Sequence, residues 1–273
     1  MAAAAVGASA ISWLGDGIAC DLVLPHGIGE PEATETLRGA LSGAPVDVVV
    51  QEQAGRRKKI LVADMDSTMI DQECIDELAD EIGLKDHVAA ITARSMNGEI
   101  EFEPALRERV ALLRDLDRGV VDRIIASRLT LASGARTLVQ TMRAAGAWTT
   151  LVSGGFDVFT RRIAAMLGFH EDRANRLLIA GGRLTGEVAE PILGRAAKAE
   201  ALVEVAAKLG LAPADAIAVG DGANDLDMLR LAGTGVALHA RPAVAAQSKV
   251  RIDHGDLTAL LYLQGFQRSE FSA

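Results

Sequence analysis

The stretch that decides the fold spans residues 58–74 and reads KKILVADMDSTMIDQEC. Residues 60–63 form a short apolar run rich in strand-favouring side chains, and two acids one residue apart, Asp64 and Asp66, follow it. A buried strand has no packing reason to end in paired carboxylates, because burying a charge is costly. We therefore expect residues 60–63 to be a buried strand whose carboxyl end carries a polar site.

Short apolar runs alternate with helix-patterned segments along the rest of the chain. The runs are ILVAD, WTTLVSGG, AIAVGDG, GTGVAL and KVRI, and segments 134–146 and 194–210 show helical periodicity between them. This alternation predicts an α/β fold with a Rossmann-like parallel sheet and crossover helices. Ligands of such sheets bind beyond the carboxyl ends of the strands, where Asp64 and Asp66 are expected.

One interval does not fit the alternation. Roughly 80 residues separate the first strand from WTTLVSGG, far more than one crossover helix needs. The interval carries a stripe of apolar residues at helical spacing, formed by Ile75, Leu78, Ala79 and Ile82. FEPALRERVALLRDL continues the helical pattern, with Pro104 suited to a first helical turn. We predict that residues 73–132 form a helical cap inserted after the first core strand, while residues 58–72 and 133–267 form the core.

Residues 1–57 are expected to form a separate, small α+β segment. ISWL, IACDLVLP and VDVVVQ favour strands, and PEATETLRGALSG favours a helix before the last of them. The polar and basic stretch EQAGRRKK is a plausible linker to the core. The opening MAAAAVGASA lacks the basic region and the long apolar region of a signal peptide, so we interpret it as a flexible tail.

Composition argues against several classes of partner. The net charge is −9 and aromatic residues make up 3% of the chain, which disfavours nucleic acid and anionic membranes. No apolar run approaches the ~18 residues of a membrane span. Two cysteines, Cys20 and Cys74, build neither a zinc site nor a disulfide framework, so we expect a cytoplasmic protein.

Polar residues follow three of the predicted strands. Asp64 follows the first, Ser153-Gly154-Gly155 the second and Gly220-Asp221-Gly222 the third, with Asp225 shortly after. If these strands are parallel neighbours, their acids gather in one crevice and need a compensating cation. Oxygen-only ligands beside a phosphate favour Mg²⁺, and the five histidines show no metal-ligand spacing.

The same edge has the parts of a phosphate site. Lys198, on the helix before the third strand, can place a compact positive charge on a phosphate. Ser153 supplies a hydroxyl, and Gly154 and Gly155 allow close approach of the backbone. The helix expected from Phe156 aims its N–H groups at an anion. Together these groups predict a site for phosphoryl chemistry.

Two aspartates suit a two-step transfer. A carboxylate can attack phosphorus and carry the group as an aspartyl-phosphate. A second carboxylate can protonate the leaving alcohol and later accept a proton from water. We assign Asp64 as the nucleophile and Asp66 as the acid and base.

These motifs resemble a known family. D-x-D-S-T after one strand, S-G-G after a second and G-D-G-A-N-D after a third resemble the haloacid dehalogenase superfamily, over residues 59–263. Within it, SMNGEIEFEPALRERV is similar to the cap segment of the enzymes that hydrolyse phosphoserine. The resemblance implies conversion of O-phospho-L-serine and water to L-serine and phosphate, the last step of serine biosynthesis.

The resemblance also implies roles for individual residues. Asp64, the backbone carbonyl of Asp66, and Asp221 would hold Mg²⁺, and Asp225 would support the metal's ligands. The phosphate and substrate would be contacted by Ser153, Gly154, Lys198 and Asn224.

The cap would supply the substrate's remaining contacts. By the resemblance, Glu73 reads the amino group, Arg109 reads the carboxylate, and Met96 and Phe102 wall the pocket. Phe102 and Arg109 are seven residues apart on one expected helix and so share a face. An arginine fork suits a carboxylate, which agrees with that assignment.

Some alternatives stay open on the sequence. The site could act on another small phosphomonoester, or transfer the phosphoryl group to an acceptor alcohol. A silent amino-acid sensor using residues 1–57 is a non-enzymatic alternative. Related bacterial enzymes often carry a regulatory domain of the ACT type there, and this segment is short for one. A homodimer is a possible assembly.

Overall fold

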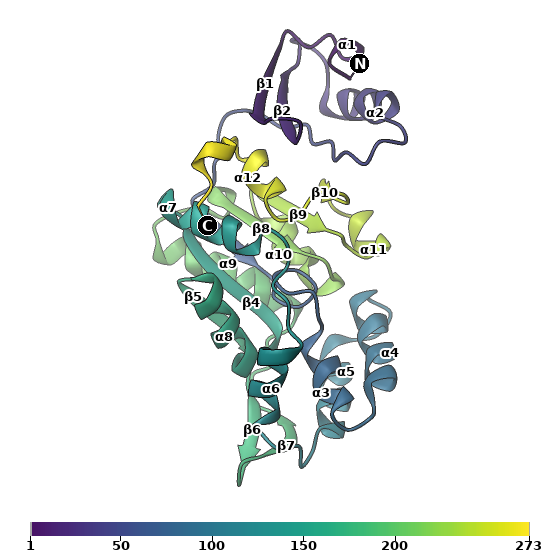
Figure 1. Ribbon diagram of the computed structural model, residues 1–273, viewed down its shortest axis with the longest axis vertical. Helices are drawn as coiled ribbons and strands as arrows, with labels where there is room; N and C mark the ends of the chain where they lie inside the picture. The colour runs from purple at the N-terminus through teal and green to yellow at the C-terminus, as the bar shows by residue number, and fades with distance from the viewer. Residues whose placement is uncertain (1, 273) are drawn as a thin grey trace.

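The computed structural model describes residues 2–272, which fold around a six-stranded parallel sheet (Figure 1). The strand order is β10-β9-β8-β3-β4-β5, and every neighbouring pair is parallel. The strands are β3 (Ile60–Ala63), β4 (Trp148–Phe156), β5 (Glu171–Asn175), β8 (Ala216–Gly220), β9 (Thr234–Leu238) and β10 (Val250–Ile252). The predicted parallel α/β fold is therefore confirmed.

Helices cover both faces of the sheet, so the central strand β3 is buried on both sides. Leu61 and Ala63 pack toward α7 (Ala135–Ala144), α8 (Asp157–Leu167) and α12 (Ala259–Leu263). Ile60 and Val62 pack toward α9 (Arg195–Lys208) and α10 (Leu226–Leu231), and the short helix α11 (Pro242–Ala245) joins that layer. Each branched side chain buried in this way contributes about 1.5–3 kcal/mol. Within residues 2–272, no helix combines the length and the apolar character needed to cross a bilayer.

Four helices, here called the cap, lie between β3 and α7: α3 (Cys74–Asp80), α4 (Lys85–Met96), α5 (Phe102–Leu112) and α6 (Val120–Ser127). They lie together beside the sheet (Figure 1). The apolar stripe predicted for α3 was wrong at Ile82, its last residue. Helix α3 ends at Asp80, and Ile82 is 37% exposed. Gly83 follows with φ +70°, a conformation that terminates helices.

The sequence patterns did not indicate three strands in residues 171–188. β5 pairs only with β4 in the sheet, and its sequence EDRAN is polar because it lies at the sheet's edge. β6 (Leu177–Ala180) and β7 (Arg183–Val188) form an antiparallel hairpin closed by two glycines, Gly181 and Gly182. Both glycines have positive φ, as a two-residue hairpin turn with the right twist requires.

The N-terminal segment contains α1 (Ala2–Ala5), β1 (Ala10–Gly15), β2 (Ala19–Val23) and α2 (Glu30–Ala40). It lies at the opposite end of the molecule from the cap (Figure 1). The strand expected at VDVVVQ is wrong, because residues 46–51 form no strand and have no strand partner in the described chain. Strand propensity alone cannot form a strand without a neighbour. Asp47 instead accepts the backbone N–H groups of Asp253 and Gly255, both at 2.7 Å.

Candidate active site

The three predicted strand ends meet at one edge of the sheet. Ala63, the last residue of β3, is in register with Val219 of β8 and Leu151 of β4. The backbone N–H of Asp64 continues the ladder by donating to the carbonyl of Val219 at 3.0 Å. Asp64 therefore lies between β4, which carries Ser153, and the end of β8, which Asp221 follows.

Lys198 belongs to α9, which packs on one face of the sheet, and it is fully buried. Its Nζ lies 2.7 Å from Oδ1 of Asp64 and 2.6 Å from Oδ1 of Asp225. Burial lowers the pKa of Lys198, but the carboxylates of Asp225 and Asp64 outweigh it and raise that pKa above its ordinary value. The lysine is therefore a fixed positive charge between two acids.

A buried acidic cluster is formed by Asp64, Asp221 and Asp225, with one carboxylate oxygen from each within 4.8 Å of the others. Asp225 already has two partners, because Oδ1 meets Lys198 and Oδ2 accepts the N–H of Gly222 at 3.1 Å. Asp221 has far less support within residues 2–272: its carboxylate accepts only a 3.4 Å hydrogen bond, from Thr68. Burial, followed by Glu73, raises the pKa of Asp221 well above its ordinary value.

This donor set fits a hard divalent cation. The three acids face a single lysine, so one cation more is needed to balance their buried charge. The donors are all carboxylate oxygens, which Mg²⁺ and Ca²⁺ prefer over nitrogen and sulfur. Burial, followed by Asp225, raises the pKa of Asp64 to about 7.

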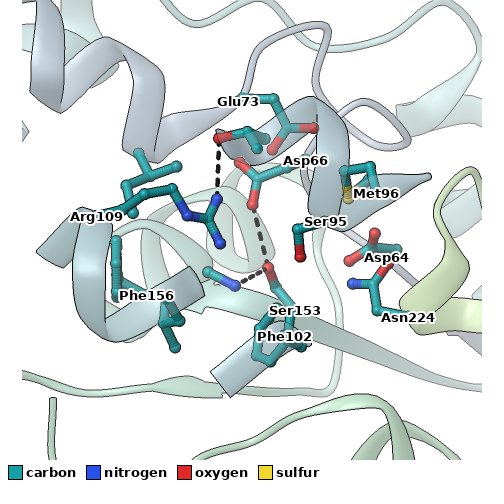
Figure 2. Close-up of a pocket in the computed structure, with 15 residues that line it drawn as sticks. Asp64, Asp66, Glu73, Ser95, Met96, Phe102, Arg109, Ser153, Phe156 and Asn224 are labelled. Carbon is teal, nitrogen blue, oxygen red and sulfur yellow. Dashed lines mark hydrogen bonds between the residues drawn. The ribbon is translucent and has the colours of Figure 1, made fainter. Parts of the chain in front are cut away.

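Asp66 faces away from the acidic cluster. Its Oδ1 accepts the backbone N–H of Cys74 at 2.9 Å. Its Oδ2 accepts the hydroxyl of Ser153 at 3.2 Å (Figure 2). Burial raises the pKa of Asp66 above its ordinary value, so its protonated form is easier to populate. The two aspartates therefore have different surroundings, which suits two different roles.

The glycines after Ser153 are required by close packing. A Cβ on Gly155 would lie 2.7 Å from Oδ2 of Asp66, and one on Gly154 would lie 2.9 Å from Cζ of Phe102. The N–H of Gly155 donates to the hydroxyl of Ser153 at 2.9 Å. The sequence predicted that this strand ends at Ser153, but β4 continues to Phe156. The helix expected from Phe156, α8, begins one residue later at Asp157.

A small cavity of about 40 Å³ lies between the sheet edge and the cap (Figure 2). Nine of the residues singled out from the sequence line it: Asp64, Asp66, Glu73, Met96, Phe102, Arg109, Ser153, Gly154 and Asn224. The others, Lys198, Asp221 and Asp225, do not line it, and they gather around Asp64. All twelve predicted side chains or backbone positions therefore converge on one site.

The cap brings one acid and one base to this cavity. Glu73 is half-buried, and burial, followed by the charge of Asp66, raises its pKa to about 8. The hydroxyl of Ser67 donates to Oε1 of Glu73 at 2.7 Å. Arg109 is 5% exposed, and it donates to the carbonyl of Ala105 at 3.0 Å through Nε.

Sequence reasoning missed three polar residues at the site. Ser67 has a left-handed backbone (φ 54°) that turns its hydroxyl to Glu73. Thr92 and Ser95 of α4 line the cavity. Their signal was spacing, because Thr92 and Ser95 lie four and one residues before Met96 on the same helix. Ser67 lies within the D-x-D-S-T motif, but the motif assigned it no role, since its conformation depends on the turn after β3.

Comparison with known proteins decides the family. The model of haloacid dehalogenase-like hydrolases matches residues 61–230, more than half of the 273 residues. The chain belongs to the haloacid dehalogenase-like hydrolase family. The matched residues include β3, the cap, β4 and the Asp221–Asp225 loop, which are the parts that build the cavity.

Individual members of the family are similar over most of this chain. A phosphoserine phosphatase of Streptomyces coelicolor is 42% identical over 88% of the chain, which spans only 60% of that relative's length. One from Albidiferax ferrireducens is 47% identical over 75% of the chain and 89% of the relative. A structure of a phospho-aspartyl intermediate analogue of phosphoserine phosphatase has a TM-score of 0.72 at 38% identity, covering 76% and 98% of the two chains.

Proposed function

We propose that this chain is a Mg²⁺-dependent phosphatase that hydrolyses O-phospho-L-serine to L-serine and phosphate. One observation carries the proposal: a single cavity is lined by the pair Asp64 and Asp66 and by the pair Glu73 and Arg109. The first pair suits phosphoryl transfer, and the second suits the amino group and carboxylate of an α-amino acid. The similar proteins named phosphoserine phosphatase support the same substrate.

The metal would be held by Asp64, Asp221 and the backbone carbonyl of Asp66, with Asp225 supporting them through Lys198 and Gly222. When bound, Mg²⁺ supplies positive charge that offsets the charge of the phosphate and of the acids. Lys198 lies against Asp64, so it is placed to act on a phosphate attached there.

In the first step an oxygen of Asp64 forms a bond to phosphorus, and the bond between phosphorus and the serine oxygen breaks. Asp66 starts protonated and transfers its proton to that leaving oxygen, which becomes the serine hydroxyl. The buried site raises the pKa of Asp66 and so favours the protonated start. Ser153 and the N–H of Gly154 would hold the phosphoryl oxygens.

In the second step a water oxygen attacks phosphorus and the bond to Asp64 breaks. Asp66, now ionised, accepts a proton from that water and is ready for another cycle. The carboxylate of Asp64 and inorganic phosphate are released. The proximity of Ser153 to Asp66, at 3.2 Å, keeps the acid beside the phosphoryl position throughout.

Substrate choice would be made by the cap. Glu73 would bind the ammonium group and Arg109 the carboxylate, while Phe102 and Met96 pack around the three-carbon body. A sugar phosphate would leave both charges buried without partners, which costs free energy. This argues against sugar phosphates and favours an amino-acid phosphate.

The cap would also move. A cavity of about 40 Å³ holds only a few water molecules and is too small for phosphoserine. We propose that the cap opens to admit the substrate and closes over it, which excludes bulk water from the transfer. Structures with and without inorganic phosphate should therefore differ in cap position.

The two other functions considered from the sequence have less support. Transfer to an acceptor alcohol would use the same residues as hydrolysis, and the similar proteins named phosphoserine phosphatase favour hydrolysis. A sensor role would use the N-terminal segment, which lies at the end of the molecule opposite the cap.

We further propose a homodimer in the cytoplasm, which light scattering and cell fractionation would check.

The direct test is phosphate release from O-phospho-L-serine with Mg²⁺ and with EDTA, using the wild type and Asp64→Asn. The wild type should be active only with the metal. Asp64→Asn should stay folded by circular dichroism and lose turnover. Retention of near-normal kcat by this variant would remove Asp64 from its proposed role.

A further inference from the structure

Arg109 is held in the cap by two residues that the proposed reaction does not use. Its Nη1 donates to Oγ1 of Thr92 at 2.9 Å, and Oγ1 of Thr92 in turn donates to Oδ1 of Asp76 at 2.7 Å. The three residues come from α5, α4 and α3, so this chain of hydrogen bonds ties three cap helices together. Figure 2 shows Arg109 turned into the pocket, with Glu73 on one side and Phe156 on the other.

The direction of these hydrogen bonds is fixed by the chemistry of a hydroxyl. Thr92 has one proton, and its oxygen lies 2.7 Å from Asp76 and 3.0 Å from the carbonyl of Val88. A carboxylate is the stronger acceptor, so the proton is directed to Asp76. The lone pairs of Thr92 are then free to accept the guanidinium proton of Arg109.

These contacts leave one side of the guanidinium open. Nε is held by the carbonyl of Ala105 and Nη1 by Thr92, which fixes the plane of the group. Nη2 has no hydrogen-bond partner among residues 2–272 and is left for a ligand. Burial lowers the pKa of Arg109, while Glu73 and Asp76 counter that effect. The guanidinium stays charged, so its free N–H groups can donate to an anion.

We propose that Thr92 and Asp76 are positioning residues that orient Arg109 for the substrate's carboxylate. This proposal rests on the function proposed above, and it deepens that function by explaining how the cap fixes a flexible side chain. An arginine held at two of its nitrogens loses less entropy when it binds a carboxylate. The effect is therefore confined to substrates that carry a carboxylate.

A matched pair of substrates separates this role from a general one. O-phosphoethanolamine keeps the phosphate and the amino group of O-phospho-L-serine but lacks the carboxylate. Thr92→Val keeps the shape of Thr92 and removes its hydroxyl. We expect this variant to lower kcat/KM for phosphoserine by about tenfold, mainly through KM, and to change that for phosphoethanolamine by less than about threefold.

Three more variants complete the design. Thr92→Ser restores the hydroxyl without the methyl group and should return phosphoserine activity to within about threefold of the wild type. Asp76→Asn keeps an acceptor but removes the charge, so it should lower phosphoserine activity less than Thr92→Val does. Thr160→Val is the matched control, because Thr160 is also a buried helix threonine that donates to an aspartate, Asp172, at 2.6 Å.

The outcomes are distinguishable. Equal losses on both substrates with Thr92→Val, or a Thr92→Ser variant as poor as Thr92→Val, would overturn the positioning role in favour of simple packing. Thr160→Val should change both substrates by the same factor. If the wild type itself shows no preference for phosphoserine over phosphoethanolamine, the proposed function fails and the positioning role fails with it.

Discussion

The Nζ of Lys198 lies 2.7 Å from Oδ1 of Asp64, and neither side chain is more than 4% exposed. The same nitrogen lies 2.6 Å from Asp225. One buried lysine therefore balances two of the three clustered acids, and the third, Asp221, has only a long hydrogen bond from Thr68 within the described chain. The site is built to hold a further positive charge.

Replacing Lys198 with Met should be costly in two ways. It leaves Asp64 and Asp225 buried without their cation, which should lower the free energy of unfolding by about 3–5 kcal/mol. It should also reduce kcat by more than about 100-fold, because a developing phosphoryl charge loses a fixed counter-charge. Chemical denaturation and phosphate release measure the two effects.

Lys198→Arg is the matched variant. It keeps the charge in a larger and flatter group, so stability should fall less than in Lys198→Met while activity stays impaired. A Lys198→Met protein with wild-type kcat would contradict the role given to this lysine.

Metal binding should protect the protein more at neutral pH than at acidic pH. Burial raises the folded pKa of Asp64 to about 7, above its unfolded value, and raises that of Asp221 as well. A raised carboxyl pKa means that the folded state binds more protons, so the metal-free protein loses stability as pH rises from about 4 to about 7. Mg²⁺ should reverse that loss, and the rise in Tm on adding Mg²⁺ to EDTA-treated protein should be larger at pH 7.5 than at pH 5.

The control for this measurement is Asp64→Asn, which removes one titrating group. Its Mg²⁺-dependent rise in Tm should vary less with pH than that of the wild type. A wild-type rise that is equal at both pH values, or larger at pH 5, would contradict the assignment of these acids.

Gly155→Ala should reduce activity without unfolding the protein. The added Cβ would lie 2.7 Å from Oδ2 of Asp66 and 3.0 Å from the hydroxyl of Ser153. Moving Asp66 by a few tenths of an ångström should lower kcat by about 10- to 100-fold, while KM changes little. Gly39→Ala is the matched control, because it adds a methyl group in open space on α2. Gly210→Ala is less suitable, because Gly210 has φ +67°, which strains any other residue. Wild-type kcat in Gly155→Ala would show that this close contact is unimportant.

Ser67→Ala should weaken recognition of the substrate's amino group. The variant removes the 2.7 Å hydrogen bond that orients Glu73. We expect kcat/KM for phosphoserine to fall about five- to tenfold, with little change for the analogue that lacks the amino group, 3-(phosphonooxy)propanoate. Equal losses on the two substrates would indicate that Ser67 supports the strand-end turn and not Glu73.

The sequence was sufficient to predict that three polar strand ends lie together. Asp64, Ser153 and Asp221 each follow an apolar run, and parallel strands place such residues at one edge regardless of loop details. The extra helices between β3 and α7 were predictable because the interval after the first strand was too long for one crossover. Glu73 and Arg109 could be placed only through resemblance to a family, since a lone acid or arginine on a helix is ordinary.

The rest depended on contacts that no local pattern encodes. VDVVVQ has high strand propensity, but it has no strand partner within residues 2–272 and forms no strand. EDRAN is polar, yet β5 forms because β4 offers a free edge. The positions of Ser67 and Thr92 depend on the left-handed turn after β3 and on the packing of three cap helices, which are tertiary features.

The most direct test of the account is the ratio of kcat/KM values for O-phospho-L-serine and p-nitrophenyl phosphate, measured with Mg²⁺ at one pH. Glu73 and Arg109 line the same cavity as Asp64 and Asp66, so phosphoserine should be preferred by about 100-fold or more. The preference should largely disappear in Arg109→Ala. Equal kcat/KM values for the two substrates in the wild type would contradict the account.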